Sequence, residues 1–74
     1  MTNVAAQRLT ESELTAIGYL RDHVENYEGD WGMVHTDSAK PSDWSLTDWY
    51  LALGCLVDRG LFVPHGFYGI VKLY

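Results

Sequence analysis

Apolar residues recur at helical spacing in the first half of the chain. The stripe consists of Leu14, Ile17, Leu20, Val24 and Tyr27. Intervals of three or four place these side chains on one face of an amphipathic helix. Thr10 followed by Glu13 matches a capping box, and Gly29 offers a residue suited to a helix end. The pattern predicts a helix over about 11–28.

A second helical pattern begins at Ser45, where Asp48 stands three residues later as in a capping box. Gly60 supplies a C-terminal cap, and Arg59 suits the negative end of the helix dipole. Gly54 inside this helix costs about 1 kcal/mol relative to alanine, which a close packing neighbour would explain. One arc of about 120° forms the expected core face. Its members are Leu46, Trp49, Tyr50, Leu53, Leu56 and Val57.

The remaining segments carry loop and strand signals. Between the helices, 29–43 is rich in loop residues, although 31–35 could form a short strand and 36–40 at most one helical turn. Pro41 ends whatever precedes it. The segments 61–63 and 67–74 are rich in β-branched and aromatic residues, and the intervening 63–66 suits a type I turn. We therefore expect a C-terminal β-hairpin.

Composition bounds the class of protein. The 74 residues are 47% hydrophobic and 14% aromatic, which favours a folded domain over a disordered chain. We expect one domain over 10–74 after a flexible tail at 1–9, and we find no internal repeat. Cys55 is the single cysteine, so no disulfide can form within the chain and a reducing cytoplasmic setting is the default. The longest apolar run, 50–57, is far shorter than the roughly 20 residues of a membrane span.

The order of these elements resembles that of the winged-helix (winged helix-turn-helix) superfamily. The segment 53–62, in which a leucine pair leads into Arg59, Gly60 and Leu61, is similar to the end of a recognition helix and the first wing strand. The segment 67–74 resembles the returning wing strand. The resemblance implies a small α+β, winged-helix-like domain with two main helices, a short middle helical turn and a C-terminal β-hairpin. The middle helix of the family is truncated here to 36–40.

Winged-helix DNA binders place the second helix of their helix-turn-helix in the major groove. In this chain the face opposite the core arc carries no Lys, Arg, Asn or Gln to contact bases or phosphates. The net charge of −5 also opposes a nucleic-acid partner. The alternative, a DNA-binding transcriptional regulator acting as a dimer in a high-salt cytoplasm, would use Arg59, His65 and Lys72.

The outward face of the second helix instead fits a protein partner or a second copy of the chain. Leu51 and Cys55 lie one turn apart between Asp48 and Asp58, next to Thr47. The open alternative is that the tail or the 29–43 loop covers this face. A second acidic set, Asp22, Glu25 and Glu28, is either a solvated helix face or a surface that engages a basic groove, as in DNA-mimicking inhibitors. These eight residues are the predicted protein-binding site.

Size and charge together resemble those of phage-encoded inhibitors, including the anti-CRISPR class, which act in the host cytoplasm. Metal and cofactor sites are not expected, because the three histidines and Cys55 show no ligand spacing. Cys55 also lies mid-helix without local oxyanion donors, so we expect a protein that is not an enzyme. Trp49 falls on the core arc, whereas Trp31 and Trp44 could either pin the loop or act as binding anchors.

Overall fold

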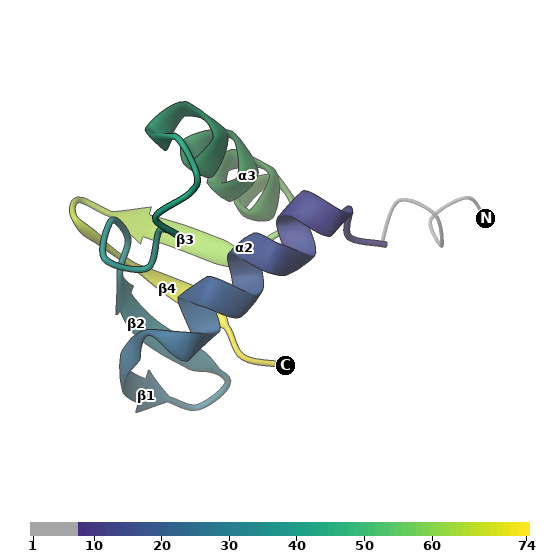
Figure 1. Cartoon of the computed structure of the whole chain (residues 1–74). Helices are drawn as coiled ribbons and strands as arrows, with labels where there is room; N and C mark the ends of the chain where they lie inside the picture. The colour runs from purple at the N-terminus through teal and green to yellow at the C-terminus, as the bar shows by residue number, and fades with distance from the viewer. Residues whose placement is uncertain (1–7) are drawn as a thin grey trace.

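The computed structural model describes residues 8–74, which form two helices and a four-stranded antiparallel sheet (Figure 1). In chain order the elements are α2 (Glu11–Asp22), β1 (Val24–Glu28), β2 (Trp31–His35), α3 (Leu46–Asp58), β3 (Phe62–His65) and β4 (Tyr68–Lys72). The strands lie in the order β1-β2-β4-β3. The expected α+β class is confirmed. The tail predicted at 1–9 lies mostly outside the described residues.

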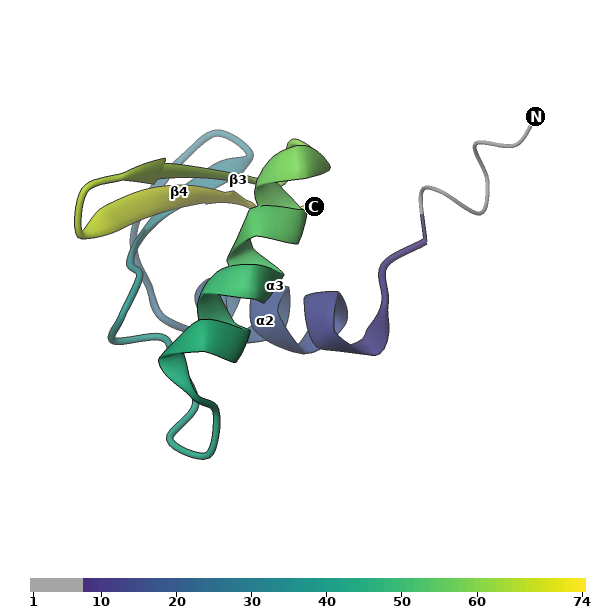
Figure 2. The same ribbon diagram turned by 90° about the horizontal axis from the view of Figure 1, so that it is seen from above.

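Both helices cover the same face of the sheet (Figure 2). One hydrophobic cluster joins them to it, and its largest fully buried side chains are Trp49, Phe62, Leu20, Leu56, Val34 and Val71. Alternate residues of β2 and β4 point into this cluster, as the two-residue period of strands requires. The opposite face of the sheet is covered by neither helix. Neither α2 nor α3 is long and apolar enough to cross a bilayer.

The first helix is shorter than predicted. Its capping box is confirmed, since Thr10 and Glu13 exchange both hydrogen bonds, but α2 ends at Asp22 rather than near 28. The residues after it form β1, which pairs with β2 through a turn at Gly29 and Asp30. Val24 and Tyr27 satisfied the helical spacing but also have high strand propensity. Pairing with β2 decides between the two structures.

The second helix is confirmed, with Ser45 as N-cap, Arg59 as C-cap and Gly60 at a φ of 76°. Its buried face is rotated from the predicted arc. Trp49, Ala52, Leu53 and Leu56 are buried, whereas Leu46, Tyr50 and Val57 of that arc are exposed. A side chain at Gly54 would meet nothing within 4 Å, so no packing neighbour in the described chain explains this glycine.

The segment between β2 and α3 contains a hydrogen-bonded turn over 35–40, in agreement with the short middle helical turn predicted there, and a second turn over 41–44. The N–H of Ala39 donates to the carbonyl of His35 at 3.3 Å, and that of Lys40 donates to the carbonyl of Asp37 at 3.2 Å. The trace continues through Pro41 into the Ser45 cap without a further helix. The described domain therefore has two regular helices and four strands.

The C-terminal hairpin is confirmed, but its turn is not where the sequence placed it. His65 pairs with Tyr68, so the loop is Gly66-Phe67 rather than a type I turn over 63–66. Gly66 has a φ of 61° and Phe67 does not have a positive φ, a combination typical of the type II′ turn that suits the twist of a hairpin. Pro64 lies inside β3, where it is tolerated because β3 is an edge strand.

The two hairpins are copies of one sequence pattern, which corrects the prediction that the chain has no repeat. Residues 29–35 read GDWGMVH and residues 66–72 read GFYGIVK, so the copies lie 37 positions apart, from Gly29 to Gly66. Each copy opens with a glycine at a φ of 61° and continues into an inner strand of the sheet. Each also has a second glycine, Gly32 or Gly69, over which a side chain of the edge strand packs. The chain is thus two successive helix-hairpin units.

Candidate functional site

A groove of about 590 Å³ separates the first turn of α2 from α3. Its lining residues are Thr10, Ser12, Glu13, Asp43, Trp44, Asp48, Leu51, Ala52 and Cys55. Three of the predicted protein-binding residues, Asp48, Leu51 and Cys55, therefore line one groove. Thr47 and Asp58 are exposed on the same helix but do not line it.

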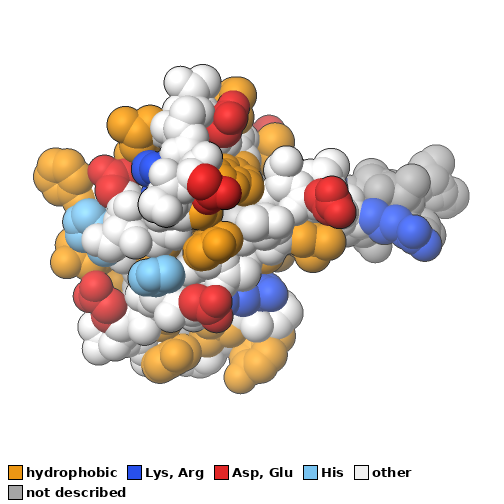
Figure 3. Space-filling model, in the orientation of Figure 1, with side chains coloured by type: hydrophobic (Ala, Val, Ile, Leu, Met, Phe, Trp, Pro, Cys, Tyr) orange, Lys and Arg blue, Asp and Glu red, His pale blue; other side chains and the backbone are white. Residues whose placement is uncertain are grey.

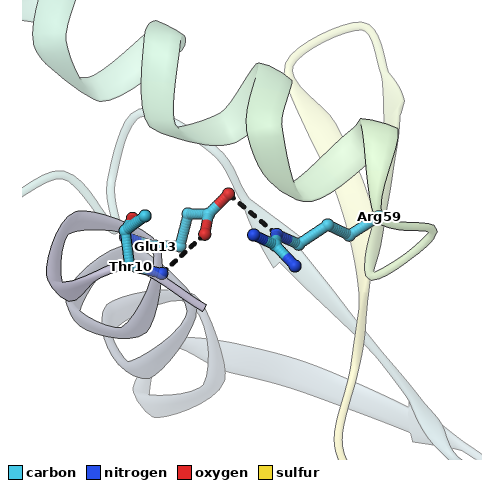
Figure 4. Close-up of polar contacts among 3 residues, drawn as sticks. All are labelled: Thr10, Glu13 and Arg59. Carbon is cyan, nitrogen blue, oxygen red and sulfur yellow. Dashed lines mark hydrogen bonds and ion pairs between the residues drawn. The ribbon is translucent and has the colours of Figure 1, made fainter. Parts of the chain in front are cut away.

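The α2 wall of the groove is fixed by its capping box and by an ion pair (Figure 4). Glu13 accepts the Thr10 N–H at 2.7 Å through one carboxylate oxygen and Arg59 Nε at 2.9 Å through the other. The Arg59 hydrogen bond, followed by that of Thr10, lowers the pKa of Glu13 despite its burial. The groove wall therefore carries a carboxylate whose charge is already compensated within the domain.

The opposite wall is held by the loop that enters α3. Lys40 donates from its ammonium group to the carbonyls of Pro41 at 3.0 Å and Trp44 at 2.6 Å, which fixes the loop beside the helix. Trp44 lies edge-on to Trp49 at a centroid distance of 5.8 Å, and Trp49 Nε1 donates to the carbonyl of Thr36 at 3.2 Å. Trp49 is thus a core residue, as predicted, and Trp44 is a half-buried wall of the groove.

The exposed side of the groove is apolar with acidic edges. Leu51 is 66% exposed and Cys55 is also exposed, so neither the 29–43 loop nor any other described segment covers this face. Asp43 and Asp48 make no ion pair within the described residues. No histidine lines the groove, so Cys55 has no neighbouring base there among residues 8–74. The arrangement can bind an apolar side chain flanked by cations.

The second predicted acidic set is not one helix face. Asp22 ends α2, Glu25 occupies a bulge in β1, and Glu28 precedes the β1–β2 turn. All three are exposed, and the prediction failed because the helix stops before two of them. Their carboxylates add to the acidity of the surface away from the groove. Figure 3 shows Asp and Glu side chains spread over one face of the molecule with few Lys or Arg between them.

Basic side chains are mostly engaged inside the described domain. Arg21 Nε donates to the carbonyl of Lys72 at 2.8 Å. Lys72 itself lies 3.9 Å from Asp30 and 5.3 Å from the centroid of the Trp31 ring. Of the residues assigned to the DNA-binding alternative, Arg59 binds Glu13, Lys72 packs on Trp31, and His65 is exposed beside the turn. These three side chains do not gather into one basic strip.

The bare face of the sheet is a second candidate surface that the sequence predictions missed. We call it the open sheet face, and its central residues are Trp31, Met33, His35, Tyr68, Ile70 and Lys72. A hollow of about 410 Å³ lies at one end of it, between Trp31 and Tyr27. The repeated hairpin pattern was the signal that could have revealed this face, because it places apolar residues on the same side of both inner strands.

Across residues 8–74, no three His, Cys, Asp or Glu side chains are grouped so that they could hold a metal ion. The chain matches no protein-family model, no curated protein and no solved structure.

Proposed function

We propose that this chain is a non-enzymatic, protein-binding domain that receives a basic, amphipathic segment of a partner in the groove between α2 and α3. The observation that carries the proposal is the pairing of an exposed apolar residue, Leu51, with two carboxylates, Asp43 and Asp48, that have no cation in the described chain. A partner would supply an apolar side chain for the groove and Lys or Arg side chains for its rim.

The charge distribution favours a basic partner. The chain has ten acidic and five basic residues, and four of the basic side chains contact acidic, aromatic or backbone groups of the domain itself. Unpaired carboxylates steer basic surfaces toward the protein at long range. This distribution fits a winged-helix-like inhibitor that covers a basic, nucleic-acid-binding surface of another protein. Such an inhibitor would act as a DNA mimic.

Gly54 adds to the same surface. It is exposed on α3 beside Cys55, and a side chain there would meet no atom within 4 Å. Glycine lets a partner backbone approach a helix more closely than other residues do. In the proposed complex, a close approach of the partner to Gly54 would offset the cost of glycine in the helix.

The test uses a designed helical peptide with leucines three and four residues apart on one face and lysines on the rest, titrated into the labelled protein and followed by amide chemical shifts. We expect the shifts to map to Leu51, Cys55 and the 43–48 segment. Leu51→Lys should abolish binding. Asp48→Asn should weaken it by about two- to fivefold, the range of an exposed ion pair. Glu28→Gln changes the charge equally on another element and should leave binding unchanged.

Shifts that map elsewhere, or equal effects of Asp48→Asn and Glu28→Gln, would refute the groove as the binding site. The natural partner is sought by affinity capture from lysate with the wild-type chain, Leu51→Lys and Glu28→Gln. A partner of the groove is one whose capture is lost with Leu51→Lys and kept with Glu28→Gln.

The DNA-binding alternative has no specific observation in its favour, since its predicted contacts are engaged or dispersed. Fluorescence anisotropy with a random duplex at low salt distinguishes the two. Binding that falls steeply with salt and is lost in Lys72→Ala would support the alternative and count against our proposal.

A further inference from the structure

The open sheet face has an approximate two-fold arrangement of its own. Met33 pairs with Ile70 across β2 and β4, and these two residues are also counterparts in the repeated hairpins. Because β2 and β4 are antiparallel, the two copies of the repeat are related by an approximate two-fold rotation about this pair. On either side lie the pairs Trp31–Lys72 and His35–Tyr68.

The pairs of this face are chemically compatible. The Lys72 ammonium lies 5.3 Å from the Trp31 centroid, and His35 lies edge-on to Tyr68 at 5.0 Å. Met33 and Ile70 are apolar neighbours, with Met33 40% exposed. On this face, each β2 residue is thus chemically suited to contact the β4 residue with which it pairs.

Charge distinguishes this face from the rest of the molecule. In β2 and β4 its one formally charged side chain is Lys72, and Glu28 of the edge strand β1 lies at its margin opposite Trp31. The other free carboxylates of the chain lie on α2, α3, the bulge of β1 and the loops. Two copies that met through α3 would bring Asp48 and Asp58 against like charges. Two copies that met through the open sheet face would not, which matters for a chain of net charge −5.

The sheet edges are unsuited to pairing with another strand. Pro64 removes a backbone donor from β3, and β1 is interrupted by a bulge at Glu25. Both features are known to block edge-to-edge association of sheets. Association through this sheet would therefore occur by stacking of faces.

We propose that the open sheet face binds a second copy of this chain, with the two-fold axis parallel to the strands between β2 and β4. Within one chain, each β2 residue of this face pairs with one β4 residue. The axis places each of these β2 side chains over the corresponding β4 residue of the other copy. Met33 then faces Ile70 of the partner copy, Trp31 faces its Lys72, and His35 faces its Tyr68. The proposal is independent of the groove, because the two surfaces share no residue.

The area of the face sets the strength of the contact. Four strands about 4.8 Å apart and five residues of about 3.4 Å give a footprint on the order of 300 Å². Stable dimers bury about 800 Å² of each partner, so this dimer is weak and depends on concentration. Stacked sheets also cross at about 30°, which confines the stated contacts to the central rows.

Sedimentation equilibrium over a range of concentrations tests the proposal with two single variants. Met33→Lys and Ile70→Glu each place two unpaired charges at the centre of their own dimer, and each should weaken it by about tenfold or more. An equimolar mixture of the two should dimerise again, because the introduced lysine of one copy then faces the introduced glutamate of the other. Circular dichroism verifies that each variant is folded.

The matched control mixes Met33→Lys with Leu51→Glu, which introduces the same charges with the acidic one on α3. In this mixture the Leu51→Glu chain should dimerise as the wild type does, whereas the mixed dimer should stay weaker than the wild-type dimer, because its one introduced lysine still faces Ile70 rather than a carboxylate. A wild-type chain that stays monomeric throughout, or variants whose mixture does not associate, would overturn the proposal. Loss of the dimer in Leu51→Lys but not in Ile70→Glu would place the contact on α3 and overturn it as well.

Discussion

Replacing Glu13 by glutamine tests whether the contact between α2 and the end of α3 stabilises the domain through charge. The Glu13 side chain is 6% exposed and that of Arg59 is 23% exposed. Glutamine can still accept the Thr10 N–H, so the helix cap is retained while the charge is lost. Hydrogen bonds to charged groups contribute about 1.5–3 kcal/mol, from which we expect Glu13→Gln to lower the free energy of unfolding by about 2 kcal/mol.

In a domain of this size, that loss should lower Tm by about 8–16 °C, measured by circular dichroism or calorimetry. Glu11→Gln is the matched control, because Glu11 is an exposed acid in the same first turn. It should lose at most the helix-dipole interaction, about 0.3–1 kcal/mol.

The effect should also depend on pH. The pKa of Glu13 is lowered in the folded protein, first by Arg59 and then by the Thr10 N–H, relative to about 4.3 in an unfolded chain. A lowered pKa stabilises the fold above the unfolded value, and this contribution disappears as the pH falls through the folded value. The difference in stability between wild type and Glu13→Gln should therefore be constant above about pH 5 and shrink below about pH 4. Equal losses for Glu13→Gln and Glu11→Gln, or a difference that persists unchanged to about pH 2, would show that the charge of Glu13 does not stabilise this contact.

Three further substitutions probe packing, and urea unfolding at neutral pH measures each of them. Gly69→Ala should cost about 1–3 kcal/mol, because the new Cβ would lie 2.6 Å from Cε1 of Phe62 and 3.0 Å from the carbonyl oxygen of Val63; an unchanged midpoint would show that the ring moves aside. Gly18→Ala, where the Cβ meets nothing within 4 Å, should instead stabilise α2 by about 0.5–1 kcal/mol, and a loss would contradict this. Thr36→Val should raise stability by about 1 kcal/mol, since the buried Thr36 hydroxyl has no hydrogen-bond partner in the described chain, and a decrease would show that the hydroxyl is satisfied.

The groove could be predicted in part from the sequence. Helical periodicity placed Asp48, Leu51 and Cys55 on the outward side of α3, and all three are exposed there. It could not supply the other wall, since Thr10 and Ser12 come from a helix more than thirty residues earlier in the chain. Nor could helical periodicity identify the partner of Arg59. An arginine at a helix end can interact with the helix dipole or a phosphate as well as with a distant carboxylate, and here it binds Glu13.

Local sequence was enough to place the start of both helices, the end of α3 and the hairpin that follows it. These features depend on hydrogen bonds within a few residues, such as those of Thr10 to Glu13 and Ser45 to Asp48. Long-range packing, by contrast, ends α2 at Asp22 and turns the next residues into β1. Val24 and Tyr27 fit a helix and a strand alike, and only pairing with β2, together with packing of Val24 against the core, selects the strand. Local bonds are encoded in local residues, whereas an ambiguous segment takes the structure that its distant neighbours stabilise.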